Sequence, residues 1–166
     1  MTAQFRALPW QKRSDAIRQA CGEPVVSNRS EPEGRIQSLV AEFGIGFEPQ
    51  NLPTQYAEAS SGECYLNAFK LALSNQCLTY VEGYAIPSDK FGITQHAWCV
   101  GSDEKIIDPT WRDSAGCTYF GIGFKTEALR KAKGFPIITE DTQPSWIKHN
   151  AKPGLHYADS QKRRPL

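Results

Sequence analysis

The chain has 166 residues, of which 40% are hydrophobic and 22% are charged. This length and composition predict a single globular domain over residues 1–166, large enough to bury its own core. The 19 basic and 18 acidic side chains nearly cancel and leave a formal net charge of +1. A balance this even argues against a dedicated nucleic-acid binder, so we expect no nucleic-acid partner.

The N-terminal sequence shows no export signal. Arg6 interrupts the first residues before an apolar segment forms, which argues against a signal peptide. No apolar run approaches the roughly 20 residues that cross a bilayer, so we expect no membrane partner. The chain has five cysteines, an odd set without an export signal, which suits a reducing compartment. We therefore predict a cytoplasmic protein.

Two helices are predicted within residues 1–43, with a polar, proline-containing loop at residues 23–34 between them. The first runs from Pro9 to Cys21, because proline favours a helix start and the following glycine favours a stop. The second runs from Arg35 to Phe43, where apolar residues recur at i, i+3, i+4 and i+7. Residues 44–62 contain several glycines and prolines, and we expect them to form a loop that lines one side of a substrate cleft.

A third predicted helix carries Cys64 in its first turn. Ser60 and Ser61 are suitable N-cap residues, Glu63 places a negative charge near the helix start, and apolar residues follow at helical spacing as far as Asn75. Unpaired N–H groups and the positive end of the helix dipole favour a thiolate at this position. The same N–H groups suit an oxyanion that develops on a substrate carbonyl. Cys64 is therefore a candidate nucleophile.

Three strands are predicted after this helix. They are Leu78–Ile86, Gln95–Val100 and Lys105–Asp108. A turn at residues 101–104 makes the last two a hairpin, which brings Asp108 across from His96 at the start of the preceding strand. A carboxylate next to an imidazole fixes the tautomer of the imidazole and stabilises its protonated form. We expect His96 to be the acid/base partner of the thiol and Asp108 to orient it.

These residues stand in four short motifs: Gly-x-Cys at residues 62–64, Gly-Tyr at 83–84, His-Ala-Trp at 96–98 and Asp-Pro-Thr at 108–110. In order and spacing the motifs resemble the transglutaminase-like and papain-like superfamily of cysteine enzymes. The resemblance covers the middle of the chain and implies a catalytic core at residues 62–138, with thiol-based acyl chemistry where a helix meets an antiparallel sheet.

Carried over residue by residue, the resemblance makes Cys64 the nucleophile, His96 the general acid/base and Asp108 the orienting carboxylate. Papain-type members also place an oxyanion-hole glutamine a few residues before the nucleophile. In this chain Gln55 is more distant from Cys64 and Glu58 lies nearer, so the sequence departs from the family pattern, and Gln50 and Gln55 are only weak candidates for that role.

Five side chains are candidates for substrate binding. Trp98 and Trp111 would shield the imidazole from water, although large aromatic residues are more often core residues. Glu82 lies in the middle of a strand, where it would either select a cationic substrate group or face solvent, and strand alternation favours the outward position. Tyr65, which follows the nucleophile, and Gln55 complete the set.

The remaining cysteines are better explained as core residues than as ligands. There is no Cys-x-x-Cys motif, and strand alternation places His96 and Cys99 on opposite faces. We therefore expect no metal site and no cofactor.

The C-terminal part is predicted to contain both strands and short helices. Residues 117–124 form an irregular strand or a cleft rim, Thr126–Lys133 a short helix, Phe135–Ile138 an edge strand and Pro144–His149 a helical turn. The polar residues 152–166 form a tail that we expect to be mobile.

Together these elements predict an α+β fold, in which N-terminal helices and a nucleophile-bearing helix pack on an antiparallel β-sheet. The predicted function is a thiol-dependent hydrolase or acyl transferase that acts on an amide bond, as a cysteine peptidase, amidase or deamidase. A protein, a peptide or a small amide would be the substrate. Two alternatives remain open: a catalytically silent binding module on the same fold, and a nucleic-acid-associated protein that uses its basic ends.

Overall fold

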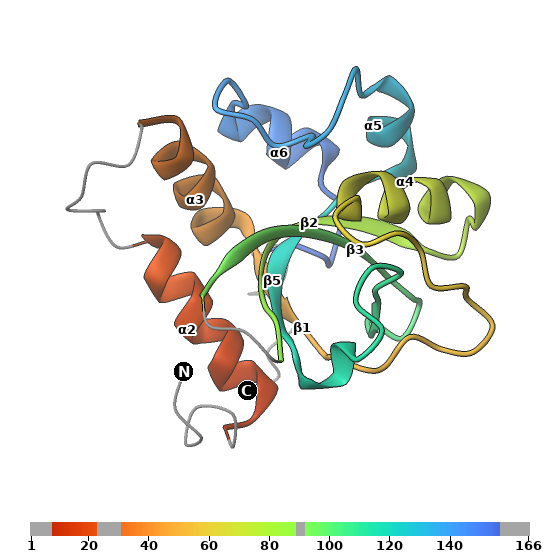
Figure 1. The fold of residues 1–166 in the computed structure, drawn as a ribbon. Helices are drawn as coiled ribbons and strands as arrows, with labels where there is room; N and C mark the ends of the chain where they lie inside the picture. The colour runs from red at the N-terminus through yellow and green to blue at the C-terminus, as the bar shows by residue number, and fades with distance from the viewer. Residues whose placement is uncertain (1–7, 23–30, 89–91, 157–166) are drawn as a thin grey trace, which may run out of the picture.

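A computed structural model describes residues 8–22, 31–88 and 92–156 (Figure 1). The predicted loop at 23–34 falls partly outside these residues, as do the N-terminal segment and residues 157–166 of the predicted tail. The helices are α2 (Trp10–Gly22), α3 (Glu31–Phe43), α4 (Cys64–Ser74), α5 (Thr126–Lys131) and α6 (Pro144–Asn150), with a 3₁₀ turn, η1, at Ser114–Gly116.

Five strands form one antiparallel sheet in the order β1-β5-β2-β3-β4. They are β1 (Ile45–Phe47), β2 (Thr79–Ile86), β3 (Thr94–Val100), β4 (Ile106–Ile107) and β5 (Thr118–Gly123). The helices lie outside this sheet, as Figure 1 shows, and α2, α3, α4 and α5 all contact its strands. The predicted α+β fold with helices on an antiparallel sheet is confirmed at this level.

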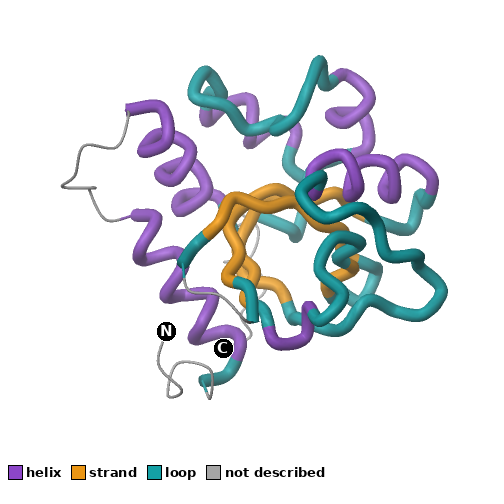
Figure 2. The backbone as a smooth tube through the Cα atoms, viewed as in Figure 1, coloured by secondary structure: helices purple, strands orange, loops and turns teal. Residues whose placement is uncertain are grey.

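The sheet is curled, so that its first and last strands approach each other (Figure 2). An isolated bridge joins Glu48, just after β1, to Lys105, just before β4, and the Ile106 N–H donates to the Glu48 carbonyl at 3.0 Å. The curl encloses an inner core that contains Trp98 and Tyr119, while a second core lies between the sheet and the helices. Both faces of the central strands are therefore covered.

The two cores confirm the predicted alternation along β3. Trp98 and Val100 belong to the inner core, whereas Ala97 and Cys99 belong to the core beneath the helices. Helix α4 packs on β2 and β3. Its first residue, Cys64, interacts with His96 and Ala97 near the start of β3.

Four predicted boundaries were wrong. Residues 44–62 are not all loop, because β1 pairs with β5 along the sheet edge. Helix α3 begins at Glu31, within the predicted loop, and α5 ends at Lys131. The N-cap of α4 is Glu63, without a side-chain cap bond, so neither serine caps the helix. The partner of β1, strand β5, lies far away in the sequence.

Two C-terminal predictions also differ from the structure. Residues 135–138 form no strand, because the Pro136 nitrogen cannot donate and the next two N–H groups bind Glu82 instead. Residues 152–156 are docked on the sheet, with Leu155 buried and its carbonyl bound to the Gly123 N–H at 3.0 Å. The predicted helical turn at Pro144–His149 is confirmed as α6.

Candidate active site

The three predicted catalytic residues come from three elements that meet at one end of the sheet. Cys64 is the first residue of α4, His96 lies near the start of β3, and Asp108 directly follows β4. The β3–β4 register pairs Cys99 with Ile107, which carries the chain back toward His96. The His96 Nε2 and Asp108 Oδ2 atoms are 2.7 Å apart, so the predicted contact between imidazole and carboxylate is confirmed.

Asp108 is fully buried and held by four hydrogen bonds. Its Oδ1 accepts from the backbone N–H groups of Thr110 at 2.8 Å and Trp111 at 3.1 Å. Its Oδ2 accepts from the Tyr119 hydroxyl at 2.8 Å and from His96. An ionised carboxylate only accepts hydrogen bonds, so the proton of His96 on this side lies on Nε2. The Nδ1 atom is then the ring nitrogen that remains for the thiol of Cys64.

The imidazole of His96 is nearly removed from solvent, with 2% of its surface exposed. Trp111 stacks on it, with ring centroids 3.8 Å apart and planes at 12°. The ring centroids of Trp98 and His96 are 6.1 Å apart. Stacking fixes the plane of the ring and excludes water from one face, so the imidazole has little freedom to turn away from Cys64.

The electrostatics of Cys64 and His96 favour a thiolate–imidazolium pair. Burial raises the pKa of the Cys64 thiol, but the hydrogen bond and positive charge of His96, with the N–H groups of Ala97 and Tyr65, outweigh burial and lower it below its ordinary value. Burial lowers the pKa of His96, but hydrogen bonds to Asp108 and Cys64 and their charges raise it to about 9. Both shifts act in the same direction, toward a charged imidazole beside a charged thiol.

The start of α4 also offers N–H donors. The first helical hydrogen bond runs from the Asn67 N–H to the Glu63 carbonyl at 2.9 Å. The N–H groups of residues 64–66 therefore have no carbonyl acceptor four residues earlier. Of these, the Tyr65 N–H lies against the Cys64 thiol.

Asn67 is a positioning residue that the sequence reasoning missed. Its side-chain amide donates to the Ser60 carbonyl at 2.7 Å and to the Thr110 hydroxyl at 3.1 Å. It therefore ties the helix that carries Cys64 to the segment that carries Asp108. The sequence signal that could have indicated this role is a polar residue one turn after the cysteine, on the buried face of an apolar helix.

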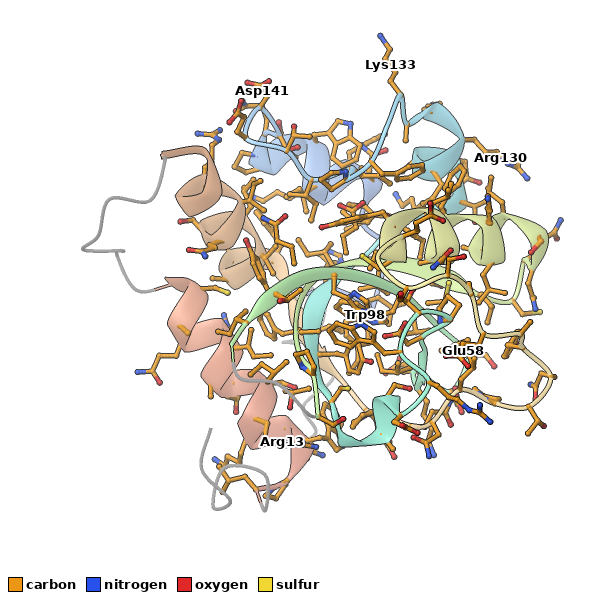
Figure 3. All side chains as sticks on the ribbon, in the orientation of Figure 1. Arg13, Glu58, Trp98, Arg130, Lys133 and Asp141 are labelled. Carbon is orange, nitrogen blue, oxygen red and sulfur yellow. The ribbon has the colours of Figure 1, made fainter. Side chains whose placement is uncertain are left out.

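The five substrate-binding candidates lie in different environments. Tyr65 and Trp111 are half-buried beside the catalytic residues, and Gln55 is exposed in the turn at 54–56. Trp98 is fully buried in the inner core, and Figure 3 shows it inside the curl of the sheet. Of the two glutamines considered for an oxyanion hole, Gln50 donates instead to the Ile106 carbonyl at 2.9 Å.

The outward position expected for Glu82 was wrong. Its side chain is 2% exposed, because helices and the curled sheet cover both faces of β2 and alternation there does not predict exposure. Its Oε1 accepts from the Tyr80 hydroxyl and the Ile137 N–H, both at 2.6 Å, and its Oε2 from the Ile138 N–H at 2.8 Å. Burial raises the pKa of Glu82 to about 7 despite these bonds.

The other cysteines differ from Cys64. Burial raises the pKa of Cys21 to about 12, and it also raises the pKa values of Cys99 and Cys117. The Cys99 thiol donates to the Ala68 carbonyl at 3.2 Å, as expected for a core residue. Cys77 is exposed.

Within residues 8–22, 31–88 and 92–156, no three His, Cys, Asp or Glu side chains come together as a metal site. In that same part of the chain, no helix has both the length and the apolar character needed to cross a bilayer.

Comparisons with known proteins assign no family to this chain. No protein-family model matches it, no curated protein matches it, and no solved structure matches it. The case for a function therefore depends on the geometry and chemistry of the site.

Proposed function

We propose that this protein is a cysteine-dependent enzyme that cleaves an amide bond or transfers its acyl group, on a core related to the papain-like and transglutaminase-like enzymes. The observation that carries the proposal is the contact chain from Cys64 through His96 to Asp108, assembled from three separate elements. A buried, fully bonded carboxylate that orients an imidazole beside a thiol of lowered pKa is the arrangement that nucleophilic catalysis requires.

In the first half of the reaction, the Cys64 thiolate attacks the amide carbon and forms a C–S bond. The carbonyl electron pair moves to oxygen, where N–H groups at the start of α4 hold the negative charge. The electron pair then returns, the C–N bond breaks, and His96 gives its Nδ1 proton to the leaving amine. The product is an acyl-enzyme and a free amine.

In the second half, neutral His96 removes a proton from water or from an amine as that molecule attacks the thioester. The C–S bond breaks and Cys64 leaves as a thiolate beside the imidazolium. Water gives a carboxylic acid, which is the outcome of a peptidase, amidase or deamidase. An amine gives a new amide, which is the outcome of an acyl transferase.

A panel of fluorogenic peptide amides and glutamine-containing peptides tests this proposal. We expect release of amine or ammonia by the wild type and by Cys77→Ser, the exposed-cysteine control, and none above background by Cys64→Ala. A peptidyl vinyl sulfone should add its mass to Cys64 in the wild type and much more slowly in His96→Ala. Turnover by Cys64→Ala would show that the reaction does not depend on this thiol. No turnover by the wild type, together with equal labelling of Cys64 and Cys77, would support a binding module without catalysis.

A further inference from the structure

A groove of about 470 Å³ is lined by the end of α5, by the segment that follows it and by one side chain of α6. The lining residues are 131–137, Thr139 and Trp146. Sites that bind small molecules have volumes of about 300–1,000 Å³, so the groove has the size of such a site. None of its lining residues belongs to those proposed for catalysis or substrate binding at Cys64.

Two aromatic side chains form apolar walls of the groove. Phe135 packs on Phe69 and Tyr80, with ring centroids 4.4 Å and 6.2 Å apart. Trp146 packs on Phe124 at 5.8 Å and is nevertheless exposed. Both rings are therefore held from one side and offer apolar surface on another. A ligand with a flat aromatic body would remove that surface from water and stack on the rings.

The segment that carries these walls is fixed to the sheet. The N–H groups of Ile137 and Ile138 donate to the Glu82 carboxylate at 2.6 Å and 2.8 Å. The Ile138 side chain is buried, as is Glu82. Because this part of the groove is already held in place, a ligand would not have to order it on binding.

The charge of the lining favours an anion. Lys131 and Lys133 are exposed, and no acidic residue lines the groove. Within the described part of the chain, neither lysine forms an ion pair. Asp141 follows the lining segment, but Figure 3 shows it and Lys133 at opposite ends of the connection between α5 and α6. Exposed ion pairs are individually weak, so the walls would supply most of the affinity and the lysines the preference for an anion.

We propose that this groove binds a small organic acid with a flat aromatic body, whose rings lie against Trp146 and Phe135 and whose carboxylate meets Lys131 and Lys133. A folded protein partner typically contacts about 20–30 residues on each side, whereas nine residues line this groove. A small molecule is therefore the better fit. The proposal is independent of the reaction at Cys64, and either can fail without the other.

Titrations with 2-naphthylacetate and with its neutral isostere 2-naphthylacetamide test the groove, followed by NMR at the Trp146 indole N–H. That signal is assigned by its loss in Trp146→Ala. We expect saturable shifts with the acid and at least fivefold weaker binding of the amide. The double variant Lys131→Gln, Lys133→Gln should bind the two probes equally. Lys12→Gln, which changes an exposed lysine on α2, should keep the preference.

Two results with the wild type, which require no folded variant, would overturn the proposal. One is a shift that does not saturate, and the other is equal affinity for the acid and the amide. A peptide with one tryptophan between glutamates is the competitor, and we expect it to bind no more tightly than 2-naphthylacetate. Binding of that peptide at least tenfold more tightly would instead make the groove a docking surface for a protein segment and rule out the small acid as its ligand.

Discussion

Replacing Asp108 with asparagine should leave the protein folded but lower the rate of reaction at Cys64 by about 10⁴-fold, the effect expected when a triad carboxylate becomes an amide. The asparagine oxygen can still accept from the N–H groups of Thr110 and Trp111. Its NH₂ group, however, would face His96 as a donor. The imidazole would then accept at Nε2 and carry its proton on Nδ1, and so could not take a proton from Cys64.

Turnover and the alkylation rate of Cys64 at pH 6–7 measure this effect, with circular dichroism as the test of folding. Asp113→Asn is the matched control, because Asp113 is exposed and lies in the same stretch of chain. If Asp108→Asn kept the wild-type alkylation rate, the carboxylate would have no part in activating the thiol.

Replacing Trp98 with alanine should lower the free energy of unfolding by about 3–5 kcal/mol. The side chain is fully buried within the curl of the sheet. It packs edge-on against Phe47 at 5.8 Å and Tyr119 at 5.0 Å. Gly121 on β5 lies against the Trp98 side chain, since a Cβ added to this glycine would lie 2.9 Å from the indole. Removing the indole therefore leaves a cavity that neighbouring residues cannot fill without moving the sheet.

Urea unfolding of Trp98→Ala beside Trp146→Ala measures this effect. Trp146 lies on α6 and is 36% exposed, so its loss should cost less than about 1 kcal/mol. A Trp98→Ala protein of wild-type stability that had lost substrate affinity would contradict the core role and favour the expected role in substrate binding.

The elements that could be predicted from the sequence are those whose signal is local. The amphipathic pattern around Ile36 to Phe43 and the alternation of residues 95–100 predicted α3 and β3, although not every boundary. The contact between His96 and Asp108 was predictable because a short hairpin fixes the register of its two strands. The same reasoning placed Cys64 at the start of a helix next to them.

The features that could not be predicted depend on contacts between distant parts of the chain. Glu82 was expected to face solvent because alternation assumes one exposed face, whereas the curl of the sheet covers both. Its partners at Ile137 and Ile138 lie 55 and 56 residues away, in a segment whose apolar residues are typical of an edge strand. Strand β1 and the role of Asn67 were missed for the same reason.

The most direct test of the activated cysteine is the pH dependence of alkylation at each cysteine, measured by mass spectrometry in the wild type and in His96→Ala. A thiol of lowered pKa stays ionised as the pH falls below its ordinary value of about 8.5. Cys64 should therefore keep its reactivity to a lower pH than an ordinary thiol and react faster than Cys77 below that ordinary value. In His96→Ala its midpoint should move upward, because burial then raises the pKa without an imidazolium to oppose it. A Cys64 that reacts no faster than Cys77, or that is indifferent to His96, would contradict the thiolate–imidazolium pair and with it the proposed enzyme.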